Sequence, residues 1–240
     1  MKFLIDFHTV HLWWAFLDIA PEPLSGLSAL LSKEEAARAE RFISDVHTRH
    51  FTAARGILRR LLGNYLAIPP EDVIIRRDRQ GKPYLDNPEA AAPLCFNLSH
   101  SRGVALFGFS VNRRLGVDVE RIDPGRNPEK LARRFFRPEE FRAVMAASGP
   151  ARRERFFRYW TIKEAYLKAV GDGIGRLGDV AVQETPAGWR IRDAATGAAK
   201  GWTVRPVSIR AGYAGAVAFD GRPPASVSVF QVDHENFTNL

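Results

Sequence analysis

The sequence predicts an α+β fold of two pseudo-symmetric halves, each a long helix packed on an antiparallel sheet, with the functional site in the cleft between them. Residues 32–66 begin with the capping-box pattern Ser32-Lys-Glu-Glu35 and stop before Pro69-Pro70, which predicts a helical region. Residues 156–171 contain no proline or glycine before Gly171, a suitable left-handed stop, and predict a second helix of about four turns. Short apolar runs follow both helical regions and predict strands.

The two halves share a plan in which an arginine and a phenylalanine precede a long helix that strands follow. Arg41-Phe42 stands before the first helix, and Arg134-Phe135-Phe136 stands before the second. This repetition predicts a boundary near residues 110–114, which divides the chain into residues 1–112 and 113–240. A cleft between two such halves is a common place for a ligand.

The first half contains enough strands for one sheet. Residues 10–19 predict a buried strand, residues 73–77 a short strand, and residues 80–85 a turn with a short extended piece. Residues 96–103 form a polar interruption between a short strand and a clear strand at residues 104–110.

The second half opens with residues 115–122, in which apolar and acidic residues alternate as in a strand. Asn127-Pro128 and Pro138 each predict the start of a helix, because proline is favoured in the first turn. Further strands are predicted at residues 180–184, 189–192, 202–209, 213–219 and 226–231.

The composition is that of a globular protein made in a reducing compartment. Of the 240 residues 45% are apolar and 26% are charged, which is a normal globular mixture. The single Cys95 excludes an internal disulfide and a cysteine-based zinc cluster. Neither a signal peptide nor a run of eighteen apolar residues is recognisable, so we expect a cytoplasmic protein without a membrane segment.

The chain is basic, with 35 lysines and arginines against 27 acidic residues and a net charge of +8. This excess favours an anionic partner, which could be a nucleic acid, an acidic protein or a polyphosphate ligand. A basic surface that is merely solvated is the alternative, because net charge alone carries no specificity.

Five residues at helical spacing share one face of the second helix: Phe157, Trp160, Glu164, Leu167 and Lys168. A carboxylate and an ammonium on an apolar face are unusual, because burying them is costly unless something compensates their charge. Taken alone, this helix favours an ordinary Glu164–Lys168 surface pair at i,i+4, and the strand at residues 115–122 shifts the interpretation toward a functional pair.

The strand at residues 115–122 adds two more carboxylates. Asp118 and Glu120 point to one face of the strand, where they repel each other unless a cation lies between them. With Glu164 they form a plausible oxygen-ligand site for Mg²⁺. Pairing of Glu120 with Arg121 or Arg114 is the alternative for that residue.

Five short motifs occur in a known order and separation: the arginine-rich first helix, Gly81-Lys82-Pro83, Phe96-Asn-Leu-Ser-His-Ser101, Gly116-Val-Asp-Val-Glu120 and Trp160-Thr-Ile-Lys-Glu-Ala-Tyr-Leu-Lys-Ala169. They closely resemble the signatures of the 4′-phosphopantetheinyl transferases of the large, pseudo-dimeric Sfp type. The resemblance covers roughly residues 38–175. It implies transfer of the phosphopantetheine arm of coenzyme A to a serine of an apo acyl or peptidyl carrier protein, with release of adenosine 3′,5′-bisphosphate.

The resemblance also implies roles for residues near the reacting phosphate. Asp118, Glu120 and Glu164 look like the ligands of Mg²⁺, for which Mn²⁺ can substitute, and Glu164 also looks like the group that orients or deprotonates the serine. Lys168 resembles the lysine that contacts the phosphate. Ser99 and His100 resemble the pair that holds the pyrophosphate, although a histidine in a loop could simply hold a turn.

The same resemblance implies which residues bind coenzyme A. Arg38 and Arg55 stand where relatives place basic residues on the 3′-phosphate and neighbouring phosphates, and Lys82 and Pro83 stand where relatives contact the adenine. Solvated arginines and an ordinary Gly-Lys-Pro turn are the alternatives. Two departures affect this anchoring: Glu35 replaces a second basic residue, and Phe51 replaces a small hydroxylated residue.

We therefore expect a monomeric enzyme of fatty acid, polyketide or nonribosomal peptide biosynthesis that acts on carrier proteins and binds neither nucleic acid nor membrane. Arg133-Arg134 and Arg152-Arg153 are candidate contacts for an acidic carrier, or a solvated basic face. A nucleic-acid-binding α+β protein without catalysis is the competing hypothesis. It leaves Asp118, Glu120 and Glu164 unexplained.

Overall fold

The computed structural model describes residues 3–87, 93–194, 197–198, 201–221 and 226–233. It is a mixed α+β fold, as predicted. The elements of the first half are β1 (Thr9–Phe16), α1 (Pro21–Ser28), α2 (Lys33–Ala39), α3 (Asp45–Leu66), the 3₁₀ turn η1 (Pro70–Asp72), β2 (Ile75–Arg77), β3 (Pro83–Leu85), β4 (Leu94–Ser101) and β5 (Val104–Val111).

The second half begins at β6 and adds three helices. Its elements are β6 (Leu115–Arg121), α4 (Pro128–Phe135), α5 (Pro138–Met145), α6 (Gly149–Val170), the 3₁₀ turn η2 (Ile174–Arg176), β7 (Val180–Thr185), β8 (Gly188–Asp193), β9 (Gly197–Ala198), β10 (Trp202–Val207), β11 (Tyr213–Asp220) and β12 (Ser226–Gln231). No described helix has the length and apolar character needed to cross a membrane.

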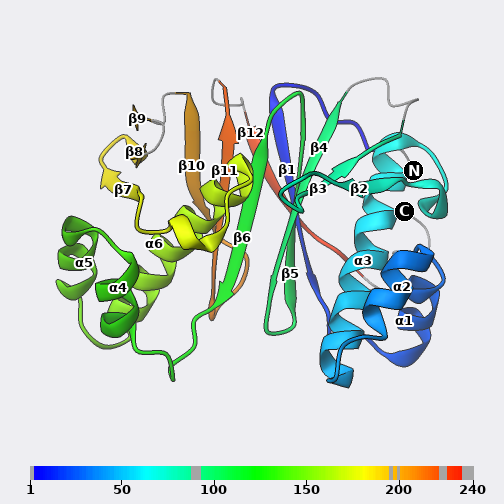
Figure 1. Cartoon of the computed structure of the whole chain (residues 1–240), viewed down its shortest axis with the longest axis horizontal. Coiled ribbons are helices and arrows are strands. Elements are labelled where there is room, and N and C mark those ends of the chain that lie inside the picture. The colour runs from blue at the N-terminus through cyan, green and yellow to red at the C-terminus, as the bar shows by residue number, and fades with distance from the viewer. Residues whose placement is uncertain (1–2, 88–92, 195–196, 199–200, 222–225, 234–240) are drawn as a thin grey trace.

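Two sheets face each other in the middle of the molecule, and one long helix covers the outer face of each (Figure 1). One sheet has the order β12-β1-β5-β4 and packs against α3; the other has the order β10-β11-β6 and packs against α6. Between the sheets lies an apolar layer that includes Leu12, Leu106 and Val117. Both long helices have 22 residues and end at a left-handed residue, Ala67 or Gly171, which makes the two halves alike.

The last strand returns to the first half. β12 pairs in parallel with β1, with Val10 opposite Val227, whereas the other strand pairs are antiparallel in the described part of the chain. A division at residue 112 therefore leaves one strand of the C-terminal half in the sheet of the N-terminal half. The side chain of Phe230 stacks on Trp13 at a ring separation of 4.6 Å, which fastens this strand.

The sequence and the structure differ at two places that matter for the site. Residues 96–103 are not an interruption, because residues 94–101 form β4, whose polar side chains alternate. The first helical region is divided into α2 and α3 by residues 40–44, so α3 starts at Asp45.

Gly116 explains how closely α6 approaches β6. A Cβ atom on Gly116 would lie 2.1 Å from the carbonyl oxygen of Ala165 and 2.4 Å from the amide nitrogen of Ala169. Only a residue without a side chain allows this contact, since real Cβ atoms do not approach backbone so closely. The acidic strand and the helix that carries Glu164 are thereby held together.

Candidate active site

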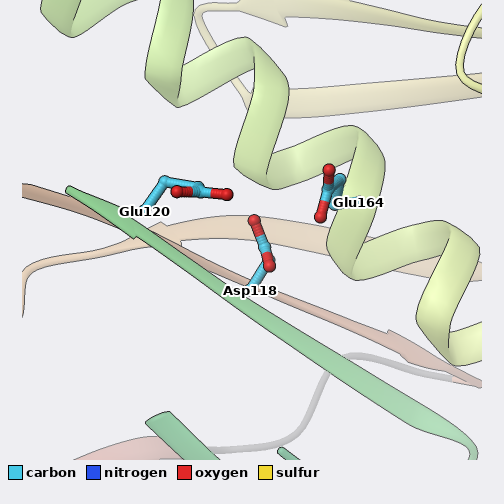
Figure 2. A group of neighbouring side chains, drawn as sticks. All are labelled: Asp118, Glu120 and Glu164. Carbon is cyan, nitrogen blue, oxygen red and sulfur yellow. The ribbon is translucent and has the colours of Figure 1, made fainter. Parts of the chain in front are cut away.

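Three carboxylates from β6 and α6 converge between the two elements. Figure 2 shows Asp118 and Glu120 extending from β6, with Glu164 extending from α6 toward them. Three carboxylate oxygens, one from each residue, all lie within 4.8 Å of one another. Asp118 and Glu164 are buried, at 1% and 6% exposure, and Glu120 is partly buried.

Lys168 lies one turn beyond Glu164 on α6 and makes its ion pair with Asp118. Its Nζ donates to Asp118 Oδ1 at 2.6 Å and to Ser99 Oγ at 2.8 Å. An ordinary Glu164–Lys168 surface pair does not describe this geometry, because Glu164 is buried and the ammonium faces the strand.

Hydroxyl groups of β4 support the acidic residues of β6. Ser99 Oγ donates to Asp118 Oδ1 at 2.8 Å, and Ser101 Oγ donates to Glu120 Oε2 at 2.7 Å. Glu120 is thus held by Ser101 and not by Arg114, whose guanidinium pairs with Asp220. Sequence reasoning missed the role of Ser101; the alternation of polar side chains in residues 97–101 was the available signal.

Burial and neighbouring carboxylates raise the pKa values of Glu164 and Glu120. Burial is the first cause that raises the pKa of Glu164 to about 8, and repulsion from Asp118 and Glu120 adds to it while Lys168 opposes it. Burial also raises the pKa of Glu120, although its hydrogen bond from Ser101 acts against the shift. A proton or a cation is therefore favoured between these side chains near neutral pH.

The residues present fit a hard divalent cation. Asp118 Oδ2 is buried and has no hydrogen-bond partner within the described residues, an arrangement that is costly unless another ligand occupies that side. The three carboxylates supply only oxygen ligands, and the single ammonium of Lys168 balances only one of the charges that they carry when ionised. Oxygen ligands of this kind suit Mg²⁺ or Ca²⁺, in contrast to the nitrogen and sulfur ligands of zinc.

His100 lies near the end of β4 with an exposed side chain. Together with Ser101 it lines a pocket of about 650 Å³. Although the residue is exposed as a whole, the protein around the imidazole lowers the pKa of His100, by desolvation first and by the nearby Lys168 cation second. The imidazole is therefore favoured in its neutral form, which can both donate and accept a hydrogen bond.

Arg38 and Arg55 line a separate basic pocket of about 460 Å³. Arg55 is 8% exposed, and its Nη1 has no hydrogen-bond partner within the described residues. Burial is the main cause that lowers the pKa of Arg55 to about 10, and neighbouring arginines add to the effect. A buried guanidinium nitrogen without a hydrogen-bond partner favours an anionic ligand.

The two departures, Glu35 and Phe51, both lie at this pocket. Glu35 Oε2 accepts from Arg59 Nε at 2.6 Å, so its charge is already paired. The guanidinium groups of Arg38 and Arg55 both lie near the ring of Phe51. Their Cζ atoms are 5.4 and 5.7 Å from its centroid. Phe51 thus orients the arginines through cation–π contacts.

Lys82 and Pro83 are adjacent in sequence, but their side chains contact different parts of the protein. Pro83 lines the basic pocket, whereas Lys82 Nζ donates to the carbonyl oxygen of Ala169 at 2.8 Å, near the end of α6. The ammonium of Lys82 therefore interacts with the C-terminal carbonyls of the helix that carries Glu164 and Lys168, a favourable position for a cation.

The candidate carrier contacts lie on α4 and at the start of α6. Arg133 pairs with Glu129 one turn away at 2.8 Å, and Arg152 Nε donates to the carbonyl oxygen of Ala147 at 2.7 Å. Within the described residues Arg133 therefore has a carboxylate partner, whereas Arg152 bonds a neutral carbonyl.

Comparison with protein families gives two matches that together span most of the chain. Residues 114–218 match the model of the 4′-phosphopantetheinyl transferase superfamily, and residues 20–108 match that of the N-terminal part of 4′-phosphopantetheinyl transferases.

Individual relatives agree with these matches. The chain is 45% identical over 177 residues to the 4′-phosphopantetheinyl transferase HetI of a Nostoc species, covering 74% of this chain and 75% of that protein. It is 39% identical over 165 residues to a putative 4′-phosphopantetheinyl transferase of a Synechocystis species, covering 68% and 67%. Among solved structures, a holo-(acyl-carrier-protein) synthase of Bacillus anthracis in complex with coenzyme A matches 45% of this chain and 96% of that one, with 22% identity and a TM-score of 0.35.

Proposed function

This chain belongs to the 4′-phosphopantetheinyl transferase superfamily, and we propose that it transfers the 4′-phosphopantetheine arm of coenzyme A to a serine of an apo carrier protein, using Mg²⁺ held by Asp118, Glu120 and Glu164. The observation that carries the metal assignment is the convergence of these three carboxylates around the unpartnered Asp118 Oδ2.

When bound, a divalent cation would neutralise charge on the pyrophosphate and on the oxygens that become more negative during transfer. The remaining requirements are positioning and further neutralisation, which fall to side chains of this chain.

We assign Lys168 and Glu164 to different tasks at the reacting phosphate. Lys168 supplies a cation beside Asp118, where it can bind a phosphate oxygen and stabilise the leaving group. Glu164, whose pKa is raised to about 8 in the free chain, is suited to orient the incoming serine and accept its proton, directly or through water.

Coenzyme A is proposed to lie across the first half of the chain toward this centre. Arg38 and Arg55 bind the 3′-phosphate or its neighbours, Pro83 contacts the adenine, and Ser99 and His100 hold the pyrophosphate. The unpartnered guanidinium nitrogen of Arg55 supports the phosphate assignment. Lys82 contributes its aliphatic stem, because its ammonium is engaged by Ala169.

The enzyme is proposed to act as a cytoplasmic monomer that attracts acidic carrier proteins. One chain carries every side chain named here, which supports a monomeric enzyme with one site between residues 1–112 and 113–240. We place the enzyme in the cytoplasm, where coenzyme A and carrier proteins of fatty acid, polyketide or nonribosomal peptide synthesis meet. Its charge of +8 supports attraction of an acidic carrier, with Arg133, Arg134, Arg152 and Arg153 as further contacts.

The decisive experiment incubates the protein with coenzyme A, Mg²⁺ and an apo carrier protein, and measures the mass of the carrier. We expect the mass of one phosphopantetheine arm to be gained, and expect a chelator, Asp118→Asn and Glu164→Gln each to abolish the gain. Glu22→Gln, which removes an exposed carboxylate from α1, is the matched control and should transfer normally. Normal transfer by both Asp118→Asn and Glu164→Gln would refute the metal assignment.

A further inference from the structure

The turn between β2 and β3 reaches from the first half of the chain to the end of α6. Lys82, the last residue of this turn, donates from its Nζ to the carbonyl oxygens of Ala169 in α6 at 2.8 Å and of Leu115 in β6 at 3.5 Å. A Cβ atom on Gly171, the left-handed residue that ends α6, would lie 2.7 Å from Gln80 Oε1. Two residues of one turn therefore contact the place where α6 ends beside β6.

The side chain of Asp78 holds this turn in shape. Its Oδ1 accepts from the backbone amides of Gln80 and Lys82, at 2.9 Å each, and its own amide donates to the carbonyl oxygen of Lys82 at 3.0 Å. The carbonyl oxygen of Gly81 accepts from Arg77 Nη1 at 2.8 Å. Because these local bonds restrict the backbone, the ammonium of Lys82 is directed at α6 from a fixed base.

The ammonium of Lys82 is partly buried where it meets the end of the helix. Desolvation is the first cause that lowers the pKa of Lys82, and the charge of Asp78 opposes it. In return the ammonium binds a carbonyl oxygen of the last turn of α6, where carbonyls lack an intrahelical partner and the helix dipole is negative. A hydrogen bond from a charged donor is strong and directional, so it fixes the position of the group that accepts it.

Lys82 adjoins both parts of the proposed active site. The next residue, Pro83, lines the basic pocket that we assign to the phosphates of coenzyme A. On the other side, Ala169 directly follows Lys168, whose Nζ donates to Asp118 Oδ1 at 2.6 Å. A shift at the end of α6 would therefore move the ammonium of Lys168 relative to the coenzyme A pocket.

We propose that Lys82 is a positioning residue for transfer, which fixes the end of α6, and with it the ammonium of Lys168, relative to the coenzyme A pocket of the first half. This inference rests on the proposed function, in which Lys168 binds a phosphate oxygen. The apolar layer between the two sheets holds the halves together, but apolar contacts are non-directional. A misplacement of about 1 Å at a reacting group can lower a rate about a hundredfold, so a directional bond at this place is important.

Two other roles for the Lys82 ammonium predict different results. If it binds a phosphate of coenzyme A, it has to leave Ala169, and its removal should weaken the binding of coenzyme A. If it only stabilises the fold, its removal should lower the melting temperature without changing the kcat of the folded enzyme.

The test is Lys82→Met, which keeps an unbranched apolar side chain and removes the ammonium. We expect kcat to fall about tenfold or more at a temperature where the variant is fully folded, while the Kd for coenzyme A stays within about twofold of the wild type. Arg79→Met, at an exposed cation of the same turn, is the matched control and should leave both constants unchanged. A wild-type kcat in Lys82→Met, or a weakened binding of coenzyme A, would overturn the proposal.

A double-mutant cycle tests whether Lys82 acts through Lys168. In the Lys168→Met background, Lys82→Met should lower the transfer rate by less than about twofold, because the group that Lys82 positions is absent. The slow reaction is followed by the mass of the carrier, with the enzyme in excess over the carrier. A further fall of about tenfold in this background would mean that Lys82 acts independently of Lys168, contrary to the proposal.

Backbone hydrogen exchange reports on the end of α6 without requiring any transfer. The amides of residues 165–171 should exchange about tenfold faster in Lys82→Met than in the wild type, because the end of the helix opens more often, and at the wild-type rate in Arg79→Met. Equal exchange in Lys82→Met and the wild type would contradict the anchoring of α6. If the wild type transfers no arm, the proposed function fails, and the exchange rates still decide whether Lys82 holds the end of α6.

Discussion

The ammonium of Lys163 lies 2.6 Å from the carboxylate of Glu140, and both side chains are completely excluded from water. Glu140 also accepts hydrogen bonds from the backbone amides of Arg137 and Val182, at 2.8 and 2.6 Å. One ion pair therefore joins α5, α6 and the start of the β7–β8 hairpin. Because Lys163 directly precedes Glu164, this pair anchors the segment of α6 that presents the carboxylate to β6.

Replacing Lys163 by methionine should destabilise the protein by about 3–5 kcal/mol, because it leaves the Glu140 carboxylate buried without its cation. The free energy of unfolding is measured by urea denaturation. Lys130→Met, at an exposed lysine of α4, is the control and should change it by less than about 0.5 kcal/mol. Equal stabilities of the two variants would show that the buried pair contributes nothing specific.

Gly116→Ala should reduce both stability and transfer, since the added methyl group would overlap the backbone of α6 at Ala165 and Ala169. Moving α6 away from β6 costs on the order of 1–3 kcal/mol for overpacking and shifts Glu164 relative to Asp118. Gly178→Ala is the control, because a Cβ at Gly178 meets no atom within 4 Å. Urea denaturation and the transfer rate are measured together; wild-type values for Gly116→Ala would contradict the close approach.

Local sequence patterns were sufficient for the fold class and for the relative orientation of the acidic residues. The alternation in residues 115–122 predicted that Asp118 and Glu120 share a face, and helical spacing put Lys168 one turn from Glu164. The resemblance to the superfamily, which the relatives confirm, suggested that the three carboxylates belong together. Their separate roles in catalysis stay predictions.

Contacts between distant segments could not be read in this way. The bond of Lys168 to Asp118 and the support of Glu120 by Ser101 depend on which strands lie beside one another. The parallel return of β12 to β1 depends on a connection whose direction no local pattern encodes. The lack of a hydrogen-bond partner for Arg55 Nη1 within the described residues likewise follows from tertiary burial, which a sequence rich in arginine does not reveal.

Arg55→Met should weaken coenzyme A binding by about 1–3 kcal/mol, because it removes a buried cation proposed to bind phosphate. The same change should leave stability unchanged or increase it, since it also removes a buried charge whose Nη1 has no hydrogen-bond partner within the described residues. Calorimetric titration with coenzyme A and urea denaturation measure the two effects. Arg49→Met, at an exposed arginine on the same helix, is the control.

The analogue that lacks the 3′-phosphate identifies which group Arg55 contacts. If that group is the 3′-phosphate, wild type and Arg55→Met should bind 3′-dephospho-coenzyme A with equal affinity. A full loss of affinity for the analogue as well would move Arg55 to the pyrophosphate. Unchanged binding of both ligands would remove Arg55 from the coenzyme A site.

Without a divalent cation, stability should fall as pH rises from about 5 to above 8. The folded-state pKa of Glu164, about 8, exceeds its ordinary value of 4.5, so the folded protein holds a proton that the unfolded chain releases. The corresponding stability is complete below pH 4.5 and is lost as pH rises through 8, by at most about 1.4 kcal/mol per pH unit for one proton. Saturating Mg²⁺ should remove this slope, because the cation replaces the proton between the carboxylates.

Urea denaturation from pH 5.5 to 8.5 measures the slope with chelator and with Mg²⁺, and Glu164→Gln should be flatter than wild type in chelator. A slope as steep in Glu164→Gln as in wild type would assign the titration to another group. It would then no longer support the idea that a cation replaces the proton on Glu164.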